Sequence, residues 1–151
     1  MSTGGLLPQA EQKRRDVVAW LALSSIEGIG YWTLKKLSTL GVAWSAFLDL
    51  NTGDEFFATL REAGGKPQLT QYPASDWPSA RDHLWHAGEA LLKRLIDRDV
   101  TLLLKDDPLF PSQLHEAPDP PAWIFVEGNP EVLSLPSVAM VNTCSVDSQR
   151  L

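Results

Sequence analysis

The residues best suited to chemistry are two glycines and two lysines near the start of the chain. Gly28 and Gly30 lie in residues 26–30, which read Ile-Glu-Gly-Ile-Gly, and Lys35 and Lys36 follow them. Glycine lets the backbone turn tightly and approach a phosphate with no Cβ in the way. A helix that starts directly afterwards offers free N–H groups and the positive end of its dipole to that phosphate. The spacing therefore predicts a contact with a nucleic-acid backbone that does not depend on base sequence.

This arrangement resembles a helix-hairpin-helix motif, in which an apolar-x-Gly-apolar-Gly hairpin joins two short helices. A purely structural interpretation stays open beside it. Gly-x-Gly between two helices also forms an ordinary tight turn, and Lys35 and Lys36 then belong to a solvated helix face. Glu27, next to the predicted phosphate position, opposes the binding of an anion.

Tryptophan recurs through the same part of the chain, at Trp20, Trp32 and Trp44. Aromatic side chains on a nucleic-acid surface stack on unpaired bases, whereas in a small domain they more often fill the core. We expect Trp20 and Trp44 in the core. Trp32 directly follows the hairpin, so both base stacking and core packing are open for it.

Charge is unevenly distributed along the 151 residues, whose net charge is −6. Up to residue 48 the chain has three acidic and five basic residues, whereas residues 97–135 hold eight acidic and two basic ones. A negative chain does not coat duplex DNA by bulk electrostatics. Any nucleic-acid contact is therefore expected in the first third, because the second half repels phosphate.

Other polar residues do not form a convincing catalytic or metal site. Asp106 and Asp107 are adjacent after an apolar run, where a turn is expected, and His83 and His86 lack a third ligand at a matching spacing. With Cys144 as the single cysteine there is no internal disulfide. No apolar run approaches the roughly 20 residues that span a bilayer. We expect a cytoplasmic protein that is not an enzyme, binds no metal or cofactor and does not contact a membrane.

Periodicity predicts the elements that position these residues. Apolar spacing indicates helices over residues 13–23, from 31 or 32 to about 40, and near 44–48, 56–60 and 79–97. Short apolar runs at 100–104, 123–126 and 138–141 indicate strands. Two of these runs are apolar throughout, which is typical of parallel strands covered on both faces. The predicted organisation is a flexible tail (1–12), a helical domain (13–62), a linker (63–78) and a helix with the first strands of a second domain (79–151).

The order of residues in the second half is similar to that of the DNA-processing (DprA/Smf) family. The matching pieces are, in order, Asp106-Asp107, Phe110-Pro111, Leu114, Asp119-Pro120-Pro121, Trp123 to Val126, Gly128 and Ser137 to Val141. The resemblance implies an α/β chain in which a helix-hairpin-helix or SAM-like bundle precedes a Rossmann-like parallel sheet. It also implies single-stranded DNA binding and the loading of a RecA-type recombinase during DNA uptake (natural transformation).

The sequence departs from this family at its phosphate-binding loop. Asn142, Thr143 and Cys144 stand where the family has Gly, Ser or Thr, and Arg, so only Thr143 matches. Losing the arginine removes a bidentate phosphate donor. We expect a degenerate loop and an incomplete Rossmann-like domain, since the chain given stops at Leu151. Either a truncated or frameshifted copy or a short relative with an adaptor role fits this pattern.

Together these features predict a DNA-processing or recombination accessory protein. Its contact with single-stranded DNA is expected to be weak and to involve Gly28, Gly30, Trp32, Lys35 and Lys36. The alternative is a protein-interaction adaptor that uses the helical module and an open sheet without binding DNA. In either case, unpaired strand edges predict self-association or a protein partner that completes the sheet.

Overall fold

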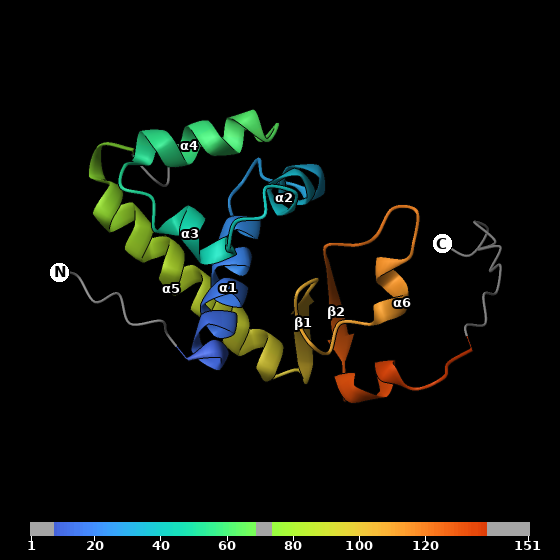
Figure 1. Ribbon diagram of the computed structural model, residues 1–151. Helices are drawn as coiled ribbons and strands as arrows, with labels where there is room; N and C mark the ends of the chain where they lie inside the picture. Colours follow the sequence, from blue (N-terminus) through green and yellow to red (C-terminus); the bar gives the residue numbers. More distant parts are fainter. Residues whose placement is uncertain (1–7, 69–73, 139–151) are drawn as a thin grey trace, which may run out of the picture.

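The computed structural model describes residues 8–68 and 74–138. Figure 1 shows the helices of residues 9–96 gathered on one side of a two-stranded sheet, with one short helix on its other side. The main helices are α1 (Gln9–Ser24), α2 (Tyr31–Ser38), α3 (Trp44–Leu48), α4 (Gly53–Glu62) and α5 (Trp77–Ile96). The sheet contains β1 (Val100–Leu104) and β2 (Trp123–Glu127), with the short α6 (Ser112–His115) between them. Two short 3-10 helices, η1 (Ala74–Asp76) and η2 (Pro130–Ser134), complete the described elements. Within the described residues, no helix is both long and apolar enough to cross a membrane.

The packing of α1 against α5 forms the centre of the molecule. Every residue of α1 from Val17 to Leu23 is buried. Gly88 of α5 lies directly against α1, where a Cβ atom would stand 2.3 Å from the carbonyl oxygen of Val18. A side chain at this position would push the helices apart, so glycine permits the close contact.

The remaining helices cover this pair. The Asp16 carboxylate of α1 accepts a hydrogen bond from the backbone N–H of Ser45, at 2.9 Å, and so holds the first turn of α3. Helix α4 is capped by the Thr52 hydroxyl, which accepts from the N–H of Glu55. The buried ring of Phe56 packs 4.6 Å from that of Trp77, at the start of α5.

The two strands are antiparallel, with Val100 opposite Glu127 and Leu104 opposite Trp123. The parallel sheet expected from the sequence is therefore wrong for the described residues. The segment between the strands contains only the four-residue α6, and the N–H of Lys105 bonds to the carbonyl of Ala122 at 2.9 Å, which extends the ladder. The chain returns as a long hairpin and makes no crossover.

Strand β1 is buried on both faces over its last three residues. Leu102 and Leu104 belong to the helical core. Leu103 points to the opposite face and is also fully buried. The uninterrupted apolar run that predicted a parallel strand is in β2, where Phe125 is 50% exposed, so burial on both faces does not account for it. The third predicted strand, at 138–141, lies outside the described residues beyond Val138.

Several predicted boundaries shift in the structure. Helix α1 begins at Gln9, so residues 9–12 of the expected tail are helical, and α5 begins at Trp77, inside the expected linker. Gly41, shortly after the end of α2, has a positive φ of 67°, which is common for a glycine that follows a helix. One hydrophobic core includes side chains of α1, α5 and β1, and the division into domains near residue 63 stays a prediction.

We expect Gly88→Ala to destabilise the fold by about 1–3 kcal/mol, because the new methyl group overlaps the backbone of α1. Helix propensity alone predicts the opposite, a gain of up to about 1 kcal/mol. Urea unfolding followed by circular dichroism measures the sign, with Arg94→Ala on the exposed face of α5 as the control. A stabilised Gly88→Ala variant would contradict the close packing of α1 and α5.

Candidate nucleic-acid interface

The hairpin between α1 and α2 is bound to another part of the same chain. The carbonyl of Gly28 accepts from the N–H of Lys66, and that of Glu27 accepts from the N–H of Gln68, both at 3.0 Å. Gly28 has a φ of +87°, and a Cβ there would lie 1.9 Å from the Lys66 carbonyl oxygen. The chain therefore needs glycine at position 28 for its own packing.

Gly30 differs from Gly28, because nothing lies within 4 Å of the position that its Cβ would occupy. It precedes the first turn of α2 with extended backbone angles, φ −115° and ψ −174°. The first N–H groups of a helix have no partner within the helix. The space beside Gly30 at the start of α2 is thus open, whereas Gly28 is covered.

The two predicted lysines have different partners inside the protein. The Lys36 ammonium donates to the backbone carbonyl of Glu62 at 2.9 Å, at the end of α4. Cations are stabilised at this end of a helix dipole. Lys36 therefore joins α2 to α4, and the structure gives it a bond within the fold.

Lys35 forms an ion pair with Asp119, in the loop that precedes β2. Its side chain is only 18% exposed, and its ammonium lies 5.7 Å from the centre of the Tyr31 ring. The hydrogen bond from Lys35 to the Asp119 carboxylate raises the pKa of Lys35 above its ordinary value, although desolvation acts in the opposite direction. Lys35 thus stays a cation at neutral pH and is neutralised by an internal carboxylate.

Aromatic rings link α2 to the sheet in a continuous row. We use the name aromatic row for the following side chains, in spatial order: Trp32, Tyr31, Trp123, Trp20 and Phe125. Successive ring centres lie 5.0, 5.4, 5.0 and 5.7 Å apart. These separations are typical of favourable aromatic pairs.

The row passes through the core at Trp20 and reaches the surface at both ends, at Trp32 and at Phe125. Trp20 and also Trp44 are buried, which confirms the prediction for both, whereas Trp32 is 75% exposed and Tyr31 48%. The Trp32 ring packs at 79° to that of Tyr31 and still has most of its surface exposed, so it has area free for stacking. The sequence identified Trp32 as a candidate but gave no sign of Tyr31, Trp123 and Asp119. Trp123 and Asp119 come close to α2 only because β2 and the loop before it pack against that helix.

The structure thus brings together only some of the predicted site. Trp32 and Lys35 both adjoin Tyr31, whereas Lys36 contacts α4 and Gly28 faces residue 66. Asn142, Thr143 and Cys144 lie outside the described residues. The exposed aromatic side chains Tyr31 and Trp32 are therefore both on α2, and the Lys35 cation beside Tyr31 is paired with Asp119.

Asp107 has a structural role, as expected for an acid at a turn. One carboxylate oxygen accepts from the N–H of Leu109 at 2.9 Å, and the other lies 2.6 Å from the Lys13 ammonium. The Asp107 side chain is 2% exposed. This ion pair, in which only the carboxylate is buried, attaches the segment after β1 to α1.

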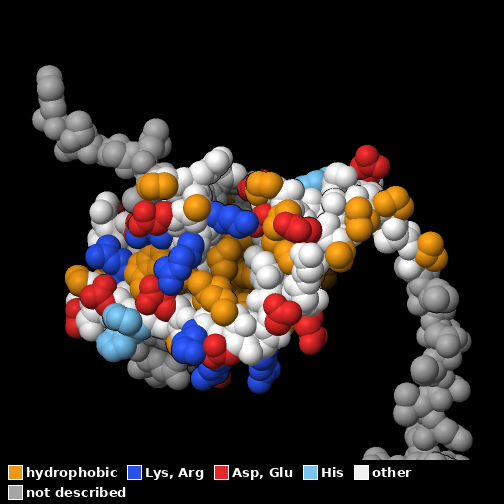
Figure 2. Space-filling model, turned by 90° about the horizontal axis from the view of Figure 1, so that it is seen from below, with side chains coloured by type: hydrophobic (Ala, Val, Ile, Leu, Met, Phe, Trp, Pro, Cys, Tyr) orange, Lys and Arg blue, Asp and Glu red, His pale blue; other side chains and the backbone are white. Residues whose placement is uncertain are grey.

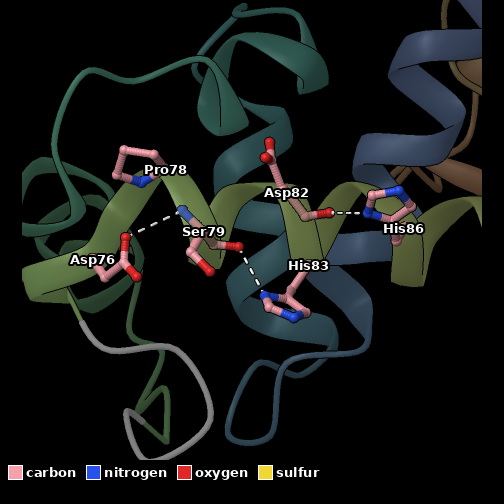
Figure 3. Close-up of a pocket in the computed structure, with 6 residues that line it drawn as sticks. All are labelled: Asp76, Pro78, Ser79, Asp82, His83 and His86. Carbon is pink, nitrogen blue, oxygen red and sulfur yellow. Dashed lines mark hydrogen bonds between the residues drawn. The ribbon is translucent and has the colours of Figure 1, made fainter.

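His83 and His86 line a shallow pocket at the start of α5, together with Asp76, Pro78, Ser79 and Asp82 (Figure 3). The Nδ1 atom of each ring lies 2.8 Å from a backbone carbonyl four residues earlier. A carbonyl only accepts, so Nδ1 must carry the proton in both rings. Among residues 8–68 and 74–138, no group of three or more His, Cys, Asp or Glu side chains could hold a metal ion.

Comparison with known families gives one match in the second half of the chain. Residues 101–150 match the family model of DNA recombination-mediator protein A. The match covers less than half of the chain, and we call these residues the recombination-mediator segment. It begins in β1 and contains α6, β2 and both acids that pair with lysines of the helical part, Asp107 and Asp119. Searches of curated proteins and of solved structures found no match.

The recombination-mediator segment is attached to the helical part by three lysine contacts. Besides Lys13–Asp107 and Lys35–Asp119, the ammonium of Lys105 donates to the carbonyl of Ser38, at the end of α2, at 2.9 Å. Two of the three contacts reach α2. The segment therefore defines one side of the surface that carries Trp32.

The contrast between the two glycines yields a paired prediction. Gly28→Ala should lower the free energy of unfolding by about 1–3 kcal/mol, since the new methyl group meets the Lys66 carbonyl and φ is positive. Gly30→Ala, at the open position, should cost less than about 1 kcal/mol. Urea midpoints of the two variants measure the difference. Equal losses would show that the hairpin does not pack on residues 66–68 as described.

Proposed function

We propose that this chain is a non-enzymatic accessory protein of DNA recombination that binds single-stranded DNA weakly through α2. In this proposal an unpaired base stacks on Trp32, and Lys35 neutralises the adjoining phosphate. The observation that carries it is the 75% exposure of Trp32 while its ring packs nearly perpendicular to that of Tyr31. Base stacking on an aromatic side chain contributes about 1–3 kcal/mol and tolerates any base sequence.

The recombination-mediator segment supports a role in DNA processing, because it lies directly beside this surface. A RecA-type recombinase is the protein partner that the family resemblance implies. The proposed contact is weak for an electrostatic reason. The net charge is −6, which opposes the approach of a phosphate backbone. On the face that Figure 2 shows, which is the underside in the view of Figure 1, Lys and Arg side chains are mixed with Asp and Glu around exposed apolar side chains.

The proposal keeps only part of the helix-hairpin-helix interpretation. Gly28 turns the backbone and Lys36 binds α4, so we assign neither to the DNA contact. Gly30 leaves space at the start of α2, where N–H groups can meet a phosphate. The contact then consists of one base and its neighbouring phosphates.

Trp32→Ala should weaken binding of fluorescein-labelled oligothymidylate by about 5- to 100-fold, because it removes the stacking surface. Fluorescence anisotropy at low and physiological salt measures the effect. The control is Leu40→Ala, which removes an exposed apolar side chain just beyond α2. Binding that is equal in both variants and in the parent chain would refute stacking on Trp32.

A second candidate function, of another class, is a protein-interaction adaptor. It is favoured by exposed apolar side chains at the sheet and at the turn that follows it. Phe125 is 50% exposed, Val132 52% and Leu135 58%. Within the described residues each strand pairs along one edge only. Unpaired edges and apolar area of this kind favour association.

Sedimentation velocity at increasing protein concentration tests the adaptor. We expect the sedimentation coefficient to rise with concentration in the parent chain and to rise less in Phe125→Lys. Its control is Glu127→Lys, at an exposed position of the same strand. A monomer at every concentration, with strand amides protected from hydrogen exchange, would exclude self-association through the sheet.

A further inference from the structure

We propose that Asp119 is an internal competitor for the phosphate site, and that it keeps the Lys35 ammonium occupied until a nucleic-acid phosphate displaces it. This inference rests on the proposed DNA contact at α2 and adds a regulatory element to it. The carboxylate belongs to the recombination-mediator segment and the lysine to the helical part, 84 positions apart in the chain. The two parts of the protein would thus control one binding surface together.

The exposure of the two side chains fits a displaceable contact. Lys35 is 18% exposed, whereas the Asp119 side chain that covers it is 74% exposed. The Asp119 carboxylate is already largely in water, so it can turn away from Lys35 and stay solvated. Exposed ion pairs are weak and are screened by salt, so a phosphate that brings an adjoining stacked base competes effectively.

The loop around Asp119 limits how far the carboxylate can move. Pro118 precedes it, and Pro120 and Pro121 follow. Proline fixes φ near −65°, and the residue before it avoids the helical region. The loop is thus restricted to few conformations, and its carboxylate is presented to Lys35 at little entropic cost.

Other contacts keep the sheet docked when the Lys35–Asp119 pair opens. Leu102 and Leu104 remain in the helical core. Lys105 still donates to the Ser38 carbonyl, and the buried Asp107 still contacts Lys13. Opening the pair therefore changes the charge at the α2 surface without separating the recombination-mediator segment from the helices.

The test measures anisotropy of labelled oligothymidylate at low salt with Asp119→Asn. Its matched control is Glu116→Gln, which removes one negative charge from an exposed residue of the same loop. We expect Asp119→Asn to bind about two- to fivefold more tightly than Glu116→Gln, the range that corresponds to the strength of an exposed ion pair. Without the lysine, the gain should disappear. The double variant Lys35→Gln/Asp119→Asn should then bind no more tightly than Lys35→Gln alone.

The outcomes separate this inference from the proposed function. If the parent chain binds in a Trp32-dependent way and Asp119→Asn equals Glu116→Gln, the DNA contact stands and the competition by Asp119 is refuted. If Asp119→Asn binds and the parent chain does not, the competition is supported in its strongest form. If neither binds, both proposals are refuted. Asp119→Ser, measured alongside, shows whether a gain comes from loss of the carboxylate or from the new amide.

Discussion

The close contact of α1 and α5 at Gly88 is the constraint on which the rest of the structure depends. Because no side chain separates the two helices there, α1 is buried from Val17 to Leu23 and becomes the central element. Helix α3 is held by Asp16 of α1, and β1 adds Leu102 and Leu104 to the same core. A chain of this size has little apolar area to spare, so a single well-packed helix pair carries much of its stability.

The position of the candidate surface follows from that core. Trp20 is fixed in α1, and its ring meets Trp123 and Phe125 of β2. Trp123 in turn meets Tyr31 of α2, against which Trp32 lies. The exposed indole is therefore connected to the centre of the protein through packed rings. A site positioned in this way is more rigid than one formed by a mobile loop, which favours stacking by lowering the entropy lost on binding.

Much of the helical part could be predicted from the sequence, because apolar spacing in α1, α2 and α5 is regular. Burial of Trp20 and Trp44 followed from the same reasoning. The strand direction could not be predicted, because the uninterrupted apolar run of β2 is typical of a parallel strand, yet β2 is a half-exposed strand of an antiparallel hairpin. The contact of Lys35 with Asp119 was also beyond sequence reasoning, since local patterns do not report a contact across 84 positions.

The interpretation of the hairpin shows how one pattern supports different roles. Gly28 and Gly30 look equivalent in the sequence, yet the Lys66 carbonyl fills the space beside the first and nothing fills the space beside the second. Lys35 and Lys36 are adjacent, yet one meets an exposed carboxylate and the other a helix end. Tertiary packing, and not the motif alone, decides which residues remain available to a ligand.

The most direct test of the central claim follows the indole N–H signals of the tryptophans by ¹H–¹⁵N NMR while oligothymidylate is added. The account predicts that the Trp32 signal shifts in proportion to the DNA bound, whereas the signals of the buried Trp44 and Trp77 stay in place. An unchanged Trp32 signal at DNA concentrations where anisotropy detects binding would contradict the account and place the contact elsewhere on the protein.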